Sequence, residues 1–151
     1  MNETLQMKTK KLKLNQIRLR IPALSENESC CRAIVGAFCA PLDPTVEELA
    51  DLKCAVSEAV TNCIVHAYRE APGSITLAMA LFSDRSVRVE VIDHGCGIAD
   101  IALARRPLYT TDPDGERSGM GFSVMESFTD RLRVISAPGV GTKIVMKKVF
   151  R

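Results

Sequence analysis

The sequence predicts an α+β fold, a two-layer sandwich with helices on one face of a mixed, mostly antiparallel sheet. Two observations support this class. Two long segments repeat apolar residues at three- and four-residue steps, and several short segments alternate apolar and polar residues between turns rich in glycine and proline. A chain of 151 residues is long enough to bury one core, and no repeat or linker divides it.

The first strand and the first helix are separated by a proline. Apolar residues and arginines alternate over 16–21, which is the period of a half-buried strand, and Pro22 ends it. Ser25, followed three residues later by Glu28, has the spacing of a capping box. We therefore expect a helix from this point to about Ala40.

The second helix is predicted to be longer. Asp43 is its expected N-cap and Pro44 its first residue, where a missing N–H has no cost. Apolar residues then recur at helical spacing to about Tyr68. The elements expected after it are strands 75–81 and 87–92 joined as a hairpin, a loop or lid over 98–118, a helix over 121–128, and strands 132–136 and 143–149.

Composition and charge exclude several classes of protein. The net charge of +2 does not by itself indicate nucleic-acid binding, and no apolar run approaches the ~20 residues that span a bilayer, so we expect neither nucleic acid nor membrane as a direct partner. The start lacks a signal peptide and the six cysteines form no CxxC pair, which predicts a cytoplasmic protein with reduced thiols.

Residues 1–14 are expected to form a flexible basic extension, with contact to an acidic partner as the alternative, and residues 15–151 a single domain.

Three polar residues, Glu58, Asn62 and His66, are spaced four apart and therefore lie along one face of the long helix. Such a stripe could simply face solvent. Alternatively, the asparagine carbonyl oxygen suits Mg²⁺, which prefers oxygen ligands and bridges phosphates. The Glu58 carboxylate, one turn away, could then orient or deprotonate a hydroxyl or water that attacks a γ-phosphate.

A second candidate lies at the end of a predicted strand, where Asp93 is followed by Gly95 and Gly97. Asp and Gly are ordinary turn residues, so a turn alone would explain them. A buried carboxylate could instead accept a hydrogen bond from the exocyclic amine of adenine, while the glycines let the base approach the backbone. Near the C-terminus, Gly141-Thr142 fits a hairpin turn and alone indicates no more.

The third candidate is the run RSGMG over 117–121, just before a predicted helix. Backbone N–H groups at a helix N-terminus favour anions, so this run could cradle phosphates. Arg117 could pair with the γ-phosphate in a bidentate geometry that lysine does not offer. A helix-entry turn with a solvated arginine is the alternative.

The three candidates follow one another along the chain in the order of helix, strand-end loop and glycine-rich helix entry. With this order the chain resembles the Bergerat-type ATP-binding fold shared by DNA gyrase, Hsp90, histidine kinases and MutL proteins. The chain further resembles the anti-sigma F factors, a family of sporulation serine kinases, from about Ile21 to Met146. The segments that carry this resemblance are ALSENES (23–29), LDPTVEEL (42–49), SEAVTNCIVHAY (57–68), ARRPLYTT (104–111) and ERSGMGFSVMESF (116–128). The lysine-rich start departs from the family, which leaves the role of residues 1–14 open.

The resemblance implies a role for each candidate residue. Glu58 would be the catalytic base, Asn62 the Mg²⁺ ligand and Asp93 the residue that reads adenine. The other implied contacts to ATP are Gly95, Gly97, Arg117, Ser118, Gly119, Met120, Gly121 and Thr142. Glu28 and Arg32 fall where the family contacts its sigma factor, and His66 matches the family without an assigned chemical step.

The resemblance also implies ATP and Mg²⁺ as cofactors and a homodimer as the assembly. Such a protein would bind and inhibit sigma F with ATP bound, and would phosphorylate a serine of its anti-anti-sigma antagonist. A general-stress-type anti-sigma kinase and an ATP-gated binding protein without phosphoryl transfer remain alternatives. A histidine autokinase is disfavoured, because both histidines lie inside the nucleotide motifs.

Overall fold

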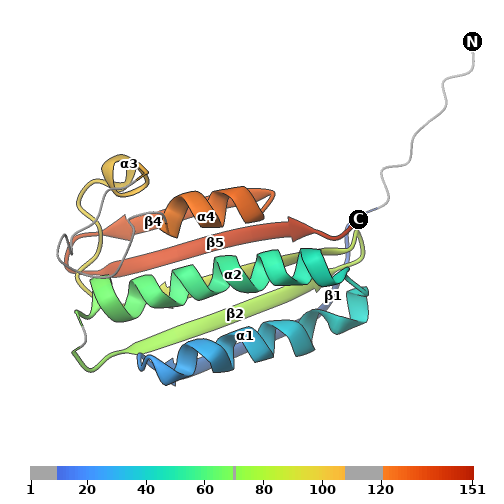
Figure 1. Cartoon of the computed structure of the whole chain (residues 1–151), viewed down its shortest axis with the longest axis horizontal. Helices are drawn as coiled ribbons and strands as arrows, with labels where there is room; N and C mark the ends of the chain where they lie inside the picture. The colour runs from blue at the N-terminus through green and yellow to red at the C-terminus, as the bar shows by residue number, and fades with distance from the viewer. Residues whose placement is uncertain (1–9, 70, 108–120) are drawn as a thin grey trace, which may run out of the picture.

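The computed structural model describes residues 10–69, 71–107 and 121–151 (Figure 1). Its strands are β1 (Lys13–Pro22), β2 (Ser74–Phe82), β3 (Ser86–Asp93), β4 (Arg131–Ala137) and β5 (Gly141–Val149). Its helices are α1 (Glu26–Cys39), α2 (Val46–Asn62), α3 (Ile101–Ala104) and α4 (Gly121–Phe128), with a 3₁₀ turn η1 (Ala40–Leu42) and a π-helix η2 (Cys63–Ala67).

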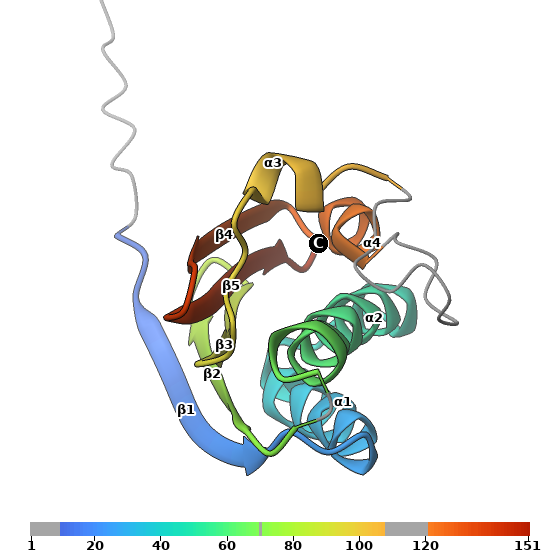
Figure 2. The ribbon, with the colours of Figure 1, turned by 90° about the vertical axis from the view of Figure 1, so that its left-hand side faces the viewer.

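The molecule has two layers. One is a five-stranded sheet in the order β1-β2-β3-β5-β4, in which each neighbouring pair is antiparallel. Figure 2 shows α1, α2 and α4 together on one face of this sheet. The α+β sandwich predicted from the sequence is confirmed, and the sheet is antiparallel throughout.

The core lies between the helices and the inner face of the sheet. Alternate strand residues point inward because side chains change face at every step along a strand. The largest fully buried side chains are Phe150, Leu52, Ile75, Leu77, Leu81, Met125, Met146, Val35, Val56, Val60, Val87 and Val89. Burial of this apolar surface on both layers fixes the strand register, because a one-residue slip would turn the apolar side chains to solvent.

The start of α1 differs from the prediction. Ser25 has helical dihedrals, φ −54° and ψ −37°, and makes no side-chain cap hydrogen bond within the described chain. The Glu28 carboxylate instead accepts a hydrogen bond from Ser57 Oγ on α2 and pairs with Arg32 Nε at 3.5 Å. The predicted capping box is therefore wrong, because Glu28 faces the neighbouring helix rather than its own N-terminus.

The start of α2 also differs from the prediction. Thr45, not Asp43, is the N-cap: its hydroxyl accepts the Glu48 N–H at 3.1 Å, and Glu48 Oε1 accepts the Thr45 N–H at 3.0 Å. These two bonds form a complete capping box. Asp43 instead has φ 50° and ends η1.

The long helix changes its hydrogen-bond pattern near its end. α2 runs to Asn62, and the chain continues as the π-helix η2 to Ala67 before Tyr68. A π-bulge of this kind is rare and often lies at a functional site. The predicted helix to about Tyr68 is therefore present, although its last turn is wider than α.

Two further features of the described residues bear on the sequence predictions. All six cysteines are free thiols, as expected. No helix in the described ranges is long and apolar enough to span a membrane.

Candidate nucleotide site

The start of α4 lies against the polar stripe of α2. A Cβ built on Gly121 would lie 3.3 Å from Glu58 Oε2 and 3.4 Å from Asn62 Oδ1. Glu58 and Asn62 are half-buried and one helical turn apart, so both oxygens face the N-terminal end of α4. The structure therefore brings together three residues that the sequence predicted for the phosphate side of the site.

Asp93 lies at the end of β3, opposite Thr142 of β5. Its side chain is only 5% exposed. Oδ1 accepts the Gly95 N–H at 3.0 Å and the Thr142 N–H at 3.2 Å, while Oδ2 lies 3.5 Å from Cys63 Sγ. This carboxylate is therefore buried and held in one orientation by backbone donors.

Cys63 contributes a third donor to Asp93. Burial raises the pKa of the Cys63 thiol well above its usual value of 9.0, and the neighbouring carboxylate of Asp93 raises it further. The thiol is therefore protonated at neutral pH and serves as a weak S–H donor to Oδ2.

The loop after Asp93 is held from several elements. Tyr68 Oη accepts the His94 N–H at 2.8 Å and donates to the Ser74 carbonyl at 2.7 Å. The Ala67 carbonyl at the end of η2 accepts the Cys96 N–H at 3.0 Å. The π-helix thus ends at the position where it can hold the predicted adenine loop.

The two glycines of this loop lie close to other backbone segments. A Cβ on Gly95 would lie 2.4 Å from the Ala67 carbonyl oxygen, and one on Gly97 would lie 2.1 Å from the Ala137 carbonyl oxygen. Gly97 also has φ +74°, a conformation that other residues rarely adopt. Both glycines are therefore required by close packing of the loop itself.

Four predicted site residues lie outside the described residues: Arg117, Ser118, Gly119 and Met120. Most of the predicted loop or lid over 98–118 lies there as well, and its described part contains the short helix α3. The phosphate role of these four residues stays a prediction.

The predicted partner residues lie on α1, whereas the described nucleotide residues lie on other elements. Arg32 is exposed and Glu28 is half-buried, and the ion pair between them has the i, i+4 spacing of a helix face. Ser57, which donates to Glu28, is next to Glu58 in sequence. Glu28, one of the two predicted partner residues, is therefore joined by one hydrogen bond to the helix that carries the predicted base.

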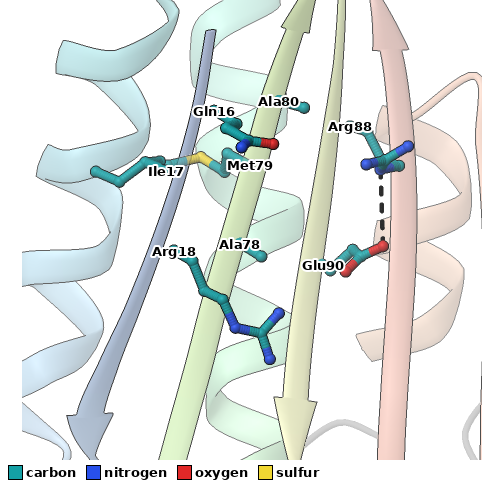
Figure 3. A pocket seen from close by; sticks show the side chains of 8 residues that line it. All are labelled: Gln16, Ile17, Arg18, Ala78, Met79, Ala80, Arg88 and Glu90. Carbon is teal, nitrogen blue, oxygen red and sulfur yellow. Dashed lines mark ion pairs between the residues drawn. The ribbon is translucent and has the colours of Figure 1, made fainter. Parts of the chain in front are cut away.

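A separate hollow lies on the face of the sheet opposite the helices (Figure 3). Its lining residues are Gln16, Ile17, Arg18, Ala78, Met79, Ala80, Arg88 and Glu90. Glu90 pairs with Arg88 at 3.6 Å and with Lys143 at 3.4 Å. None of the predicted nucleotide residues that the structure describes lines this hollow, and Asp93 and Thr142 point to the inner face.

Two side chains that hold the loop after Asp93 were not singled out from the sequence. Tyr68 holds the loop from the helix layer, and Ser136 of β4 accepts the Ile98 N–H at 2.7 Å from the sheet layer. Neither has a sequence signal of its own, because a tyrosine at a helix end and a serine in a strand are ordinary.

Comparison with known proteins agrees with this geometry. A family model described as "Histidine kinase-like ATPase domain" matches residues 21–148. An anti-sigma F factor of Clostridium acetobutylicum is 54% identical over 136 residues, which cover 90% of this chain and 94% of that protein. An anti-sigma F factor of Caldanaerobacter subterraneus is 52% identical over 134 residues, which cover 89% of this chain and 93% of that protein.

Solved structures share the fold at lower identity. The RsbU and RsbW domains of a Mycobacterium tuberculosis protein match with a TM-score of 0.65 and 22% identity, over 90% of this chain and 32% of that longer one. The histidine kinase domain of an Erythrobacter litoralis blue-light activated kinase matches with a TM-score of 0.57 and 20% identity, over 86% of this chain and 62% of that one. These two likenesses concern the fold alone.

The fold and the family match define a class, the ATPase domains of the histidine kinase-like type, whose ligand is ATP. The chain belongs to this class and, within it, to the family of anti-sigma F factors.

Proposed function

We propose that this chain is a cytoplasmic anti-sigma factor that binds and inhibits sigma F with ATP bound. It is also a serine kinase that phosphorylates its anti-anti-sigma antagonist and so controls sporulation transcription. The observation that carries the kinase proposal is the approach of Gly121 to Glu58 and Asn62, which puts a carboxylate and an amide oxygen beside a helix N-terminus. This combination suits phosphoryl transfer, which depends mainly on positioning and electrostatics.

In the proposed reaction, the serine oxygen of the antagonist attacks the γ-phosphorus of ATP. The bond from that phosphorus to the β,γ-bridging oxygen breaks, and ADP leaves with the electron pair. Glu58 accepts the proton of the serine hydroxyl and later releases it to solvent. Asp93 and Thr142 hold the adenine, while residues 117–120 complete the phosphate side.

Asn62 is the proposed protein ligand of Mg²⁺. The described residues include no group of three or more His, Cys, Asp and Glu side chains that could hold a metal ion. The Asn62 amide oxygen fits Mg²⁺, which prefers oxygen ligands, keeps several waters, and is usually bound by one or two protein oxygens together with substrate phosphates. When bound, the ion neutralises phosphate charge.

The kinase proposal is tested with the purified protein, Mg²⁺, labelled ATP and the anti-anti-sigma protein of the same genome. We expect label on an antagonist serine, and its loss in Glu58→Gln with ATP binding retained, because the amide keeps the shape but cannot take a proton. Glu47→Gln, in the first turn of the same helix, is the matched control. A labelled antagonist in Glu58→Gln would remove Glu58 as the base. No label with the wild-type protein, while ATP is bound, would favour the ATP-gated binding protein.

The sigma-binding proposal is tested on α1. Arg32→Glu reverses the charge of an exposed side chain and leaves Glu28 beside a like charge, so we expect weaker sigma binding and unchanged ATP affinity. Arg133→Glu makes the same charge change at an exposed position on β4 and is the matched control. Normal pull-down of sigma F by Arg32→Glu would place the partner surface elsewhere. Capture of a general-stress sigma factor in preference to sigma F would identify the alternative partner.

We further propose a homodimer as the working assembly, on the basis of the family resemblance. Light scattering during size-exclusion chromatography, with ATP present, measures the mass directly against the 16.5 kDa of one chain. A mass of one chain at every concentration used in the kinase assay would contradict the proposal.

A further inference from the structure

Ser136 lies on the inner side of β4, directly opposite Thr142 of β5. Its hydroxyl oxygen accepts the Ile98 N–H at 2.7 Å, lies 3.0 Å from the Gly141 carbonyl oxygen, and lies 2.8 Å from Thr142 Oγ1. One side chain therefore joins the loop after Gly97 to the strand that carries a predicted adenine contact.

The positions of the protons in this junction follow from counting donors and acceptors. A serine hydroxyl has one proton and two acceptor lone pairs. The Gly141 carbonyl has no proton, so the Ser136 proton points to it. The contact between Ser136 and Thr142 then requires the Thr142 hydroxyl to donate. The opposite assignment would leave two acceptor oxygens, Ser136 Oγ and the Gly141 carbonyl, facing each other at 3.0 Å without a proton.

This assignment decides what Thr142 can offer to a ligand. Its only hydroxyl proton is directed to Ser136, so Oγ1 presents lone pairs alone. Asp93 Oδ2, on the neighbouring strand, is also an acceptor. Two acceptors suit the 6-amino group of adenine, whereas the 6-oxo group of guanine would meet acceptors without a proton.

We infer that Ser136 is a positioning residue that makes the nucleotide pocket selective for adenine over guanine by holding the Thr142 hydroxyl proton. This inference rests on the proposed function, since it assumes that Asp93 and Thr142 face the base. The physical reason is that two part-buried acceptor oxygens without a proton between them cost more free energy than a hydrogen bond that is merely absent.

The test compares ADP and GDP binding by calorimetry for the full-length wild-type protein, Ser136→Ala and Ser136→Thr. In Ser136→Ala the Thr142 hydroxyl is free to rotate and donate to guanine. The ratio of the GDP to the ADP dissociation constant should therefore fall about threefold to tenfold, the worth of one neutral hydrogen bond. Ser136→Thr keeps the hydroxyl and should keep the ratio. Ser29→Ala, which removes a hydroxyl that donates to the Glu26 carbonyl within α1, is the control for a lost serine.

The outcomes separate this inference from the proposed function. An unchanged ratio in Ser136→Ala, or equally weakened binding of both nucleotides, would overturn the inference but would not contradict the proposed ATP site of the wild-type protein. A wild-type protein that binds neither nucleotide would overturn both. If Ser136→Ala fails to fold, Ser136→Cys replaces the hydroxyl by a weaker donor and acceptor of similar shape, and the ratio should fall there too. In a Thr142→Val background, Ser136→Ala should no longer change the ratio, and a persisting change would contradict the mechanism.

Discussion

Asp93 uses one carboxylate oxygen within the protein and leaves the other largely available. Oδ1 accepts two backbone N–H groups, whereas among the described residues Oδ2 has only the weak thiol donor of Cys63. A carboxylate oxygen can accept more than one hydrogen bond, so Oδ2 retains capacity for a ligand donor. The orientation of the side chain is therefore set before any nucleotide binds.

Asp93→Asn should weaken ATP binding about tenfold or more while the fold is retained. The amide oxygen would take the place of Oδ1, where two N–H donors demand an acceptor, so the NH₂ group would replace Oδ2 and face the adenine amine. Calorimetry with ATP measures the loss, and Asp84→Asn, at the other end of the β2–β3 hairpin, is the control. Equal affinity in Asp93→Asn and the wild-type protein would refute the adenine assignment.

At the scale of elements, the sequence predicted the helices and strands well and their caps poorly. Each predicted strand is present within a few residues, because alternation is set by the side-chain period. Glu28 turns to Ser57 of α2, a contact between helices that local spacing does not contain. The cap of α2 was missed for another reason: Thr45 and Glu48 do have the local spacing of a capping box, but the prediction placed the cap at Asp43. The change from α2 to a π-helix also has no signal in the apolar pattern.

The observed caps predict opposite results for two similar substitutions. Thr45→Ala removes the hydroxyl that accepts the Glu48 N–H and should lower the free energy of unfolding by about 1 kcal/mol. Ser25→Ala should change the free energy of unfolding by less than about 0.5 kcal/mol, because the Ser25 hydroxyl caps nothing in the described chain. Urea denaturation of both variants measures the difference. A larger loss in Ser25→Ala than in Thr45→Ala would contradict the structure.

At the scale of the whole molecule, the sequence predicted the layers but not the order of strands. Nothing in the pattern of β4 and β5 says that β5 lies between β3 and β4. That order is what places Thr142 opposite Asp93 and also opposite Ser136. The candidate residues could be found from their motifs, whereas the residues that position them, such as Ser136 and Tyr68, become visible only once the strands are assembled.

The buried thiols of the core predict a loss of stability at alkaline pH. Burial raises the pKa of Cys39 from 9.0 to about 12 and that of Cys31 to about 11, and it also raises the pKa of Cys63. Above pH 9 the unfolded chain releases thiol protons that the folded chain keeps. The unfolded state then binds fewer protons, so the free energy of unfolding falls as the pH rises.

Each such thiol should contribute about 1.4 kcal/mol per pH unit to this fall between its usual pKa and its raised one. Cys39→Ala should therefore be less stable than the wild-type protein at pH 8, since it loses a buried side chain, yet show a shallower fall between pH 9 and 11. Cys54→Ala, at an exposed position on α2, is the matched control, because a thiol near solvent contributes less to the slope. Urea denaturation across this pH range, with a reductant present, measures all three slopes. Parallel curves for Cys39→Ala and the wild-type protein would show that Cys39 ionises equally in both states, and the burial argument would then fail for this part of the core.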